Sequence, residues 1–336
     1  MNKHILIIRL SSFGDVAMTV PIVGALRLNY PKLKITILVP EPFAPLFNQI
    51  PQIDFLYFKQ TNKSFLGLLK LSRKIIKIKP DFVIDLHNVL RTKLLVFFLK
   101  SLKKNKLKYY KLNKGRKEKK ELIKGIKKEQ LKSMHQRYAD VFSRININLD
   151  LKEFKFFHKL NIKPKKYDFD SEKKLLGIAP FAKHKCKEYS IKNILKLIDL
   201  ISQEINILIF GDKNNTTKIK SIIKGKSNVF DASSGFTLEE EMEIISNLDL
   251  MISMDSANGH IASLFGIKVL TIWGATHPFT GYGPFNQPNK NSITPNLRNY
   301  PNLPVTIYGS ACPEKYLDVI NTIKPEKIAK RINEII

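Results

Sequence analysis

The stretch HILIIRLSSFGDVAM, from His4 to Met18, decides the fold expected for the N-terminal half. It joins an apolar run, typical of a strand buried on both faces, to a turn that contains two serines, a glycine and an aspartate. Helical spacing of apolar residues follows from residue 20 to residue 30. Because a strand that turns directly into a helix begins a βαβ unit, this stretch predicts a parallel sheet covered by helices.

The same alternation of strand and helix continues along the chain. Further strands are expected at residues 34–40, 53–58 and 81–86, and the order begins again at residue 175. The chain has 336 residues, which is too long for one ordinary hydrophobic core. We therefore predict an α/β protein with two doubly wound parallel-sheet domains, residues 1–165 and 166–336, and allow the last helix to pack back on the N-terminal domain.

The composition indicates a folded cytoplasmic protein. Hydrophobic residues make up 43% of the chain, and its apolar runs are far shorter than the ~20 residues that span a bilayer. The N-terminus has the pattern of a strand and no small-residue cleavage site, so we expect no secretory signal. Cys186 and Cys312 lack the spacing of a metal site, and we expect two reduced thiols.

The net charge is +28, and the excess is concentrated in one basic run. Between Lys100 and Lys132 there are fifteen lysine or arginine residues and three glutamates. Such a field attracts polyanions, for example nucleic acid, anionic lipid or a phosphorylated glycolipid. The alternative is an ordinary solvated surface. Because the run lacks the glycine–aromatic pattern of an RNA-recognition sheet, we expect no nucleic acid partner.

Small, basic and histidine residues follow three predicted strands of the C-terminal half. Asp255, Ser256 and His260 come directly after one strand, at the start of a short helix. Gly274 follows the next strand, and Lys187 follows an earlier one. Since helix starts bind anions and ligands lie at the carboxyl ends of parallel strands, these residues predict a pyrophosphate site. The alternative for Ser256 and His260 is a helix cap and a surface histidine.

Several cofactor motifs are missing from the sequence. No Gly-x-Gly-x-x-Gly pattern and no Walker loop follows a predicted strand, which argues against a nicotinamide or P-loop enzyme. No group of carboxylates resembles a metal site. We therefore expect neither a cofactor nor a metal.

Several segments together resemble glycosyltransferase family 9, the bacterial ADP-heptose:lipopolysaccharide heptosyltransferases. The most specific are the loop SSFGD (11–15) and the turn DSANGH (255–260). DFVIDLHNVLRTKLL (81–95), KEYS (187–190) and the closing CPEKYLDVINTIKPEKIAKRI (312–332) add to the similarity. The resemblance implies a GT-B fold, in which two facing Rossmann-like domains hold the acceptor on the N-terminal side and the nucleotide-sugar on the C-terminal side.

The resemblance also implies a reaction, the inverting and metal-independent transfer of heptose or a related sugar from ADP-heptose to a lipopolysaccharide core acceptor. Asp15 is the implied general base, which takes the proton of the acceptor hydroxyl. The implied donor-binding residues are Lys183, Lys187, Phe236, Asp255, Ser256, Ala257, His260 and Gly274. The implied acceptor-binding residues are Ser11, Ser12, Gly14, His87 and Arg91.

Such an acceptor is an anionic glycolipid at the inner face of the inner membrane. We therefore expect a peripheral protein whose basic run contacts that membrane surface. The lysines expected to contact lipid are Lys103, Lys104, Lys106 and Lys108. The apolar residues expected at headgroup level are Leu102, Leu107, Leu112, Leu122, Ile123 and Ile126.

Three alternatives stay open. Asp15 alone is also a favoured helix cap. Where the family commonly has a glutamate that reaches the ribose, this chain has DKNNTT (212–217), with Asp212 or Asn215 as the nearest substitutes, which favours another nucleotide-sugar donor for a different surface glycan. A non-catalytic basic module that binds polyanions or membranes is favoured by the charge and opposed by the retained Asp15, Lys187 and His260.

Overall fold

The computed structural model describes residues 3–102, 107–160, 172–233 and 235–336, and its contacts divide the chain into two compact units. The first unit consists of Met1–Lys114 and Met134–Lys155, and the second of Gly115–Ser133 and Phe156–Ile336. The segment 115–133, which we expected in the N-terminal domain, therefore belongs by its contacts to the second unit. The predicted boundary after residue 165 lies outside the described residues.

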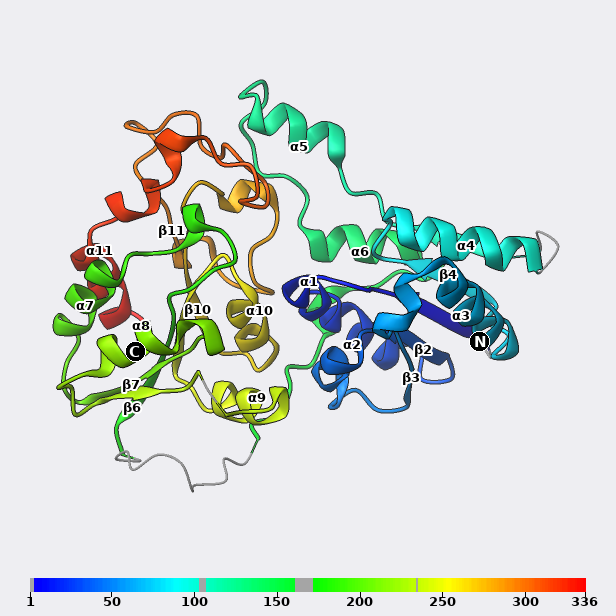
Figure 1. The fold of residues 1–336 in the computed structure, drawn as a ribbon, viewed down its shortest axis with the longest axis horizontal. Coiled ribbons are helices and arrows are strands. Elements are labelled where there is room, and N and C mark those ends of the chain that lie inside the picture. Colours follow the sequence, from blue (N-terminus) through cyan, green and yellow to red (C-terminus); the bar gives the residue numbers. More distant parts are fainter. Residues whose placement is uncertain (1–2, 103–106, 161–171, 234) are drawn as a thin grey trace. The chain divides into compact units, whose positions relative to one another are not determined.

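A parallel sheet forms the centre of the first unit (Figure 1). Its strands are β1 (His4–Ile8), β2 (Lys34–Val39), β3 (Ile53–Tyr57), β4 (Phe82–Asp85) and β5 (Lys108–Lys111). Their order across the sheet is β3-β2-β1-β4-β5, and every neighbouring pair is parallel. β1 is buried along its whole length, which explains why its sequence is a continuous apolar run. The strands expected after β1 are confirmed, and β5, inside the basic run, is an additional strand.

The helices of the first unit are α1 (Phe13–Ala17), α2 (Val20–Asn29), α3 (Phe65–Lys77), α4 (Leu90–Leu102) and α6 (Met134–Ser143). Short 3-10 helices occupy Glu41–Phe47, Gln60–Lys63 and Leu151–Glu153. α3 packs against α4, and both place leucine side chains in one core with Leu6 and Ile8 of β1. α3 and α4 therefore cover the same face of the sheet.

The second unit is built around another parallel sheet. Its strands are β6 (Lys174–Ala179), β7 (Ile205–Ile209), β8 (Val229–Asp231), β9 (Leu250–Met254), β10 (Lys268–Ile272) and β11 (Ser292–Ile293). Their order is β11-β10-β9-β6-β7-β8, and all pairs are parallel. The second half of the chain therefore repeats the architecture of the first, as the restart of the pattern at residue 175 predicts.

The helices of the second unit are α5 (Arg116–Ile123), α7 (Ile191–Asp199), α8 (Thr216–Ile223), α9 (Leu238–Ser246), α10 (Ala257–Leu264) and α11 (Pro325–Asn333). α9 begins with a capping box, since the Thr237 amide donates to Glu240 Oε2 over 2.7 Å and the Glu240 amide donates to Thr237 Oγ1 over 3.3 Å. α11 packs against α7 and places Ile328 and Ile332 in the core of the second unit. The closing helix is thus part of the core of the second unit.

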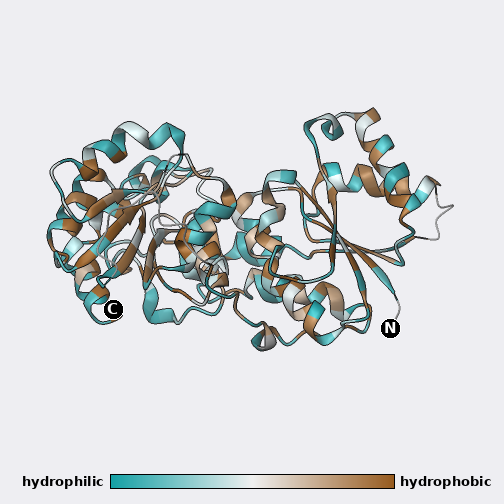
Figure 2. Cartoon of the chain, turned by 90° about the horizontal axis from the view of Figure 1, so that it is seen from below, coloured by the Kyte–Doolittle hydropathy of each residue, from teal (hydrophilic) through white to brown (hydrophobic). Residues whose placement is uncertain are grey.

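Three apolar residues of the basic run serve the protein interior. Leu107, Leu112 and Leu122 are buried, whereas Leu102 and Ile126 are exposed. A buried leucine cannot enter a layer of lipid headgroups, so the expectation that these three residues reach a membrane is wrong. Figure 2 shows the same tendency throughout the chain, because the apolar residues concentrate in the strands of each sheet.

The lysines expected to contact lipid are only partly described. Lys103, Lys104 and Lys106 lie outside the described residues, and Lys108 is exposed at the start of β5. Within the described ranges, no helix is long and apolar enough to cross a membrane.

Candidate active site

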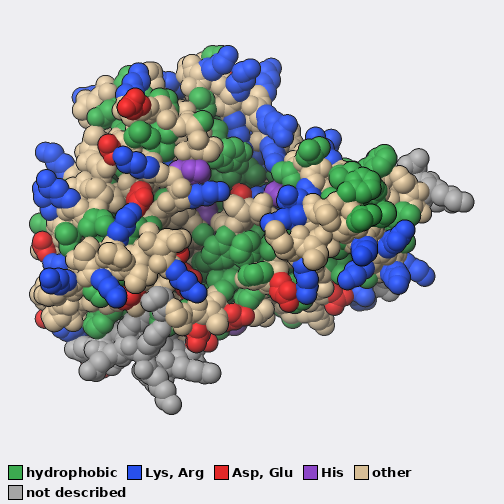
Figure 3. All heavy atoms as spheres, viewed as in Figure 1, with side chains coloured by type: hydrophobic (Ala, Val, Ile, Leu, Met, Phe, Trp, Pro, Cys, Tyr) green, Lys and Arg blue, Asp and Glu red, His purple; other side chains and the backbone are tan. Residues whose placement is uncertain are grey.

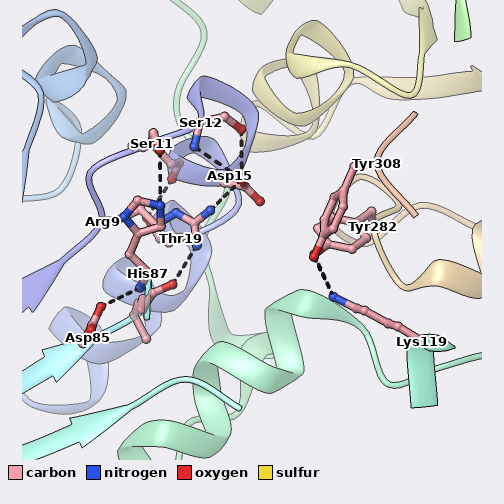
Figure 4. A network of polar contacts seen from close by, with 12 residues as sticks. Arg9, Ser11, Ser12, Asp15, Thr19, Asp85, His87, Lys119, Tyr282 and Tyr308 are labelled. Atoms are coloured by element: carbon pink, nitrogen blue, oxygen red, sulfur yellow. Dashed lines mark hydrogen bonds and ion pairs between the residues drawn. The ribbon is translucent and has the colours of Figure 1, made fainter. Parts of the chain in front are cut away.

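The loop after β1 joins polar side chains around Asp15 (Figure 4). Asp15 is the third residue of α1, and Ser12 is the N-cap of this helix. The hydroxyl and the backbone amide of Ser12 donate to Asp15 Oδ2 over 2.9 and 3.3 Å, and Arg9 Nη2 lies 2.6 Å from the same oxygen. A guanidinium favours the ionised form of a neighbouring carboxylate, which is the form that accepts a proton. Capping and general-base chemistry at Asp15 are therefore compatible.

Arg9 is a residue of this site that sequence reasoning missed. It follows β1 directly and is buried, its Nη1 donates to the Leu86 carbonyl over 2.7 Å, and its guanidinium lies 5.7 Å from the ring centroid of Tyr138. Because Leu86 follows β4, Arg9 ties the ends of two neighbouring strands together and holds Asp15 beside them. The sequence signal that could have identified Arg9 is its position directly after a strand predicted to be buried. A cation at such a position requires a partner when it is buried.

His87 stands on a turn built by Asp85. The buried Asp85 carboxylate accepts hydrogen bonds from the backbone amides of His87 and the following residue, over 2.9 and 2.7 Å, and from the Tyr109 hydroxyl over 3.0 Å. The turn brings His87 Nε2 within 3.2 Å of Ser11 Oγ, and His87 Nδ1 has no hydrogen-bond partner among the described residues. Burial and the positive charge of Arg9 lower the pKa of His87 to about 3, so its ring is neutral near pH 7 and offers one donor and one acceptor.

Arg91 and Gly14 have surroundings that the sequence did not predict. Arg91 is the second residue of α4, and its guanidinium lies 5.8 Å from the ring centroid of Phe58. Gly14 lies inside α1, so its backbone is helical. Ser11 and Ser12, which precede α1, are joined by a cis peptide bond.

In the second unit, loops from the ends of three strands meet at Asp255. Asp255 follows β9, and its Oδ2 lies 2.8 Å from Lys187 Nζ and accepts a hydrogen bond from Thr276 Oγ1 over 3.0 Å. Lys187 ends a short 3-10 helix (Lys185–Lys187) after β6, and Thr276 follows β10. The structure thus brings Lys187 and Asp255 together, and Thr276 is a partner that the sequence pattern did not single out.

The first turn of α10 follows Asp255 directly. Ala257 is its first residue and Ser256 is its N-cap, but Ser256 makes no side-chain capping hydrogen bond. Instead, Ser253 Oγ accepts from the Gly259 amide over 3.2 Å and lies 3.0 Å from Ser256 Oγ. The first amides of a helix have no partner within the helix and favour an anion. Ser256 is therefore the N-cap by position, as the alternative predicts, although its side chain makes no capping hydrogen bond, and the surface position expected for His260 in that alternative is wrong because His260 is buried.

Gly274 determines the position of the loop that carries Lys187. A Cβ at Gly274 would lie 2.2 Å from the Cys186 carbonyl oxygen, and the Ala275 amide donates to the same oxygen over 3.1 Å. Gly309, with a φ of +86°, also approaches closely, because a Cβ there would lie 2.8 Å from Lys187 Cδ. Two glycines thus leave room for the backbone and the side chain of Lys187.

The remaining donor-side residues differ in exposure. His260 is buried on α10, Lys183 is exposed, and Phe236, two residues before α9, is partly exposed. His277 accepts a hydrogen bond from the Phe279 amide at Nδ1 over 3.2 Å, and burial lowers the pKa of His277 to about 4. The neutral His277 ring therefore caps the short 3-10 helix Pro278–Thr280.

A further polar cluster of the second unit joins Lys119 to two tyrosines (Figure 4). Lys119, on α5, is buried, and its Nζ donates to Tyr282 Oη over 2.8 Å and lies 4.6 Å from the centroid of that ring. The ring centroid of Tyr308 is 5.5 Å from the same ammonium, and the two hydroxyl oxygens are 3.2 Å apart. Lys119 is therefore a structured cation, contrary to the alternative of a solvated basic run at this position.

In the parts of the chain that the structure describes, no group of three or more His, Cys, Asp or Glu side chains is placed to hold a metal ion. Cys186 and Cys312 are free thiols, and burial raises the pKa of Cys312 to about 12.

Comparisons with known proteins show what this chain is similar to. Residues 68–308 match the family model of glycosyltransferase family 9 (heptosyltransferase). The chain is 23% identical over 331 residues to lipooligosaccharide heptosyltransferase 2 of Campylobacter jejuni, covering 96% of each protein. A crystal structure of a glycosyl transferase family 9 protein from Veillonella parvula matches with a TM-score of 0.78 at 18% identity, over 99% of this chain and 97% of that one. The E. coli heptosyltransferase WaaC with ADP matches with a TM-score of 0.70 at 16% identity, over 99% of this chain and 100% of that one.

The two parallel sheets and these matches define the class, which is a glycosyltransferase with the α/β GT-B fold. The chain belongs to glycosyltransferase family 9, the heptosyltransferases. The fold class and the enzyme class expected from the SSFGD loop and the DSANGH turn are thereby confirmed.

Proposed function

We propose that this heptosyltransferase transfers heptose from ADP-heptose to a lipopolysaccharide or lipooligosaccharide core, with inversion and without a metal. The relative from Campylobacter jejuni is a lipooligosaccharide heptosyltransferase, and a solved structure of the same fold contains ADP, which supports this donor and acceptor. The observation that carries the mechanism is the Asp15 carboxylate, held by Ser12 and paired with Arg9 at the carboxyl end of β1.

Asp15 is the proposed general base on the acceptor side. The oxygen of the acceptor hydroxyl attacks the anomeric carbon, its proton passes to the Asp15 carboxylate, and the bond between that carbon and the diphosphate breaks. A single displacement of this kind inverts the anomeric centre. The proposed acceptor-binding residues are Ser11, Ser12, Gly14, His87 and Arg91. Among them, the neutral His87 ring offers hydrogen bonds and Arg91 offers positive charge to an anionic sugar.

The second unit is the proposed donor side. Lys187 and the first amides of α10 offer positive charge to the diphosphate as it leaves, so the protein itself stabilises the leaving group. Asp255 holds the Lys187 ammonium through the ion pair of 2.8 Å, and the partly exposed ring of Phe236 is the proposed cover for adenine. The proposed donor-binding residues are Lys183, Lys187, Phe236, Asp255, Ser256, Ala257, His260 and Gly274.

Direct transfer tests the proposal. Purified protein, ADP-heptose and a core oligosaccharide that lacks heptose should yield one added heptose by mass spectrometry and an equal amount of ADP. Failure to transfer under these conditions, together with turnover of another nucleotide-sugar, would reject the proposed donor.

One observation favours a different nucleotide as a second candidate. After β7, where the family commonly has glutamate, the Asp212 carboxylate accepts from the Asn214 amide over 2.9 Å and caps a short helix. The carboxylate is thus engaged locally instead of being directed at a ribose. Isothermal titration with ADP, UDP and GDP separates the candidates, and tighter binding of UDP or GDP would favour the second.

Chelation tests the proposed independence from metal. Transfer should continue at the same rate in EDTA, because Lys187 and the start of α10 provide the charge that a magnesium ion would otherwise supply. An activity that disappears in EDTA and returns with magnesium or manganese would contradict this part of the proposal.

A further inference from the structure

Helices α3 and α4 of the first unit expose large apolar side chains on one surface. The exposed fraction is 59% for Phe65 and 67% for Leu66 on α3, and 83% for Leu90 and 62% for Phe97 on α4. Figure 3 shows a group of apolar side chains over these helices with lysine and arginine side chains beside it. We call these four residues, together with the exposed basic residues of the two helices, the α3–α4 surface. Large apolar groups gathered in this way mark an interaction site.

The apolar side chains of this surface are connected. Leu90, Leu94 and Phe97 are separated by four and three residues, so they lie along the same side of α4. The ring of Phe65 packs edge-to-face on Phe98 with centroids 4.9 Å apart, and Phe97 lies 5.9 Å from Phe98. Phe98 therefore links the start of α3 to the exposed stripe of α4.

Every charged residue of these two helices is basic. The basic residues are Lys70, Arg73, Lys74 and Lys77 of α3 and Arg91, Lys93 and Lys100 of α4. All of them except the half-buried Arg91 are exposed. Apolar side chains with cations at their border fit the headgroup layer of an anionic membrane, because the apolar groups enter the layer while the cations meet phosphate.

We infer that the α3–α4 surface docks the protein on an anionic phospholipid membrane. Charge favours a bilayer over a second copy of the chain, because two such surfaces would bring only positive charges together. α4 begins three residues after His87, so the surface adjoins the proposed acceptor side. The inference rests on the proposed function, because docking on a membrane brings the enzyme to an acceptor that is carried on a glycolipid. The membrane contact is thereby assigned to exposed side chains of α3 and α4 instead of the buried leucines of the basic run.

Vesicle flotation tests the docking directly. The full chain should float with phosphatidylcholine vesicles that contain phosphatidylglycerol, and should not float with phosphatidylcholine alone or at high salt. The double variant Leu66→Ser/Phe97→Ser should lower the partition coefficient about tenfold or more, because two apolar side chains leave the headgroup layer. The triple variant Lys70→Gln/Arg73→Gln/Lys74→Gln should lower it about hundredfold on anionic vesicles.

Matched variants of the second unit are the controls. Leu200→Ser/Leu297→Ser removes two exposed apolar side chains, and Lys290→Gln/Lys315→Gln/Lys327→Gln removes three exposed charges. Both should float as the wild type does, and unchanged thermal melting should accompany every variant because all these positions are exposed. Equal flotation of the wild type and the α3–α4 variants, or an equal loss in the controls, overturns the inference. A shift from dimer to monomer in Leu66→Ser/Phe97→Ser, seen by analytical ultracentrifugation, would assign the surface to a second copy instead.

A lipid-free core oligosaccharide separates this inference from the proposed function. The α3–α4 variants should transfer to this soluble acceptor at the wild-type rate and lose rate only on an acceptor embedded in vesicles. Absent flotation with intact soluble transfer overturns the docking alone. Absent soluble transfer by the wild type overturns the proposed function, and the flotation result then stands by itself.

Discussion

Each unit carries a cation–carboxylate pair at the carboxyl ends of its sheet, and the two pairs expose opposite partners. In the first unit, Arg9 and Asp15 are 2.6 Å apart, with 6% of the arginine side chain and 24% of the aspartate side chain exposed. In the second unit, Lys187 and Asp255 are 2.8 Å apart, with 13% of the lysine and 8% of the aspartate exposed. The more exposed member is thus the carboxylate in the first unit and, by a smaller margin, the ammonium in the second.

The difference lies in which partner the surrounding protein holds. Arg9 is fixed by the Leu86 carbonyl and the Tyr138 ring, so it supports Asp15 from the interior. In the second unit Asp255 is the fixed partner, because it also accepts from Thr276. An accessible carboxylate suits the acceptance of a proton and an accessible ammonium suits the binding of an anion, which is the division of roles that we propose.

The largest expected effect comes from neutralising the accessible carboxylate. Asp15→Asn should lower kcat by about 10²–10⁴-fold and leave the dissociation constant of ADP unchanged, because only the proton acceptor is lost. Steady-state kinetics and isothermal titration measure the two quantities. Asp54→Asn, at an exposed aspartate of β3, is the control and should retain full activity. If Asp15→Asn retains more than about a tenth of the rate, Asp15 acts as a helix cap and the base lies elsewhere.

Removing the accessible ammonium should have the next largest effect. Lys187→Ala should weaken ADP binding by about 1.5–3 kcal/mol, because a charge-assisted hydrogen bond to the diphosphate is lost. Adenosine, which has no phosphate, should bind the variant almost as well as the wild type. Titration of both ligands into Lys187→Ala, with the exposed Lys192→Ala as a control, measures the contrast. Equal losses for ADP and adenosine would place Lys187 away from the diphosphate and remove the asymmetry between the units.

The support of the second pair can be tested without touching the pair itself. Gly274→Ala adds a methyl group that would lie 2.2 Å from the Cys186 carbonyl oxygen. The loop that carries Lys187 must therefore move. We expect the free energy of unfolding to fall by about 1–3 kcal/mol and ADP to bind more weakly. Gly283→Ala is the control, since a Cβ there meets nothing within 4 Å. Wild-type affinity in Gly274→Ala would show that this close approach does not position Lys187.

The smallest expected effect concerns the neutral imidazole of the first unit. The pKa of His87 is about 3 in the folded protein, well below the ordinary histidine value of 6.5 that applies to the unfolded chain. The unfolded chain therefore binds the extra proton first as the pH falls. The burial of His87 therefore lowers stability progressively between pH 6.5 and pH 3 and has no such effect at higher pH. From pH 7 to pH 5, His87→Gln should lose about 1–2 kcal/mol less free energy of unfolding than the wild type.

Urea denaturation at the two pH values measures this difference. His158→Gln, at an exposed histidine, is the control and should follow the wild type. A wild-type dependence on pH in His87→Gln would mean that the ring is not held neutral beside Arg9.

Much of this architecture could be predicted from the sequence by itself. Apolar runs without alternation, such as His4–Ile8, are typical of strands buried on both faces, and their alternation with amphipathic helices indicates parallel sheets. The SSFGD and DSANGH segments indicate the family without a structure, because the residues of each segment are consecutive in the chain. The position of Lys187 and Asp255 at strand ends was predictable for the same local reason.

Only the tertiary structure decided which side chains meet and which are exposed. Arg9 reaches Leu86 because β4 lies beside β1 in the sheet, and Lys119 meets Tyr282 across 163 positions of the chain. Leu122 is buried although the sequence around it is basic, and Phe97 is exposed although the sequence around it is apolar. Hydrophobic periodicity records which face of an element is apolar, whereas the order of strands and the packing of helices determine what covers that face.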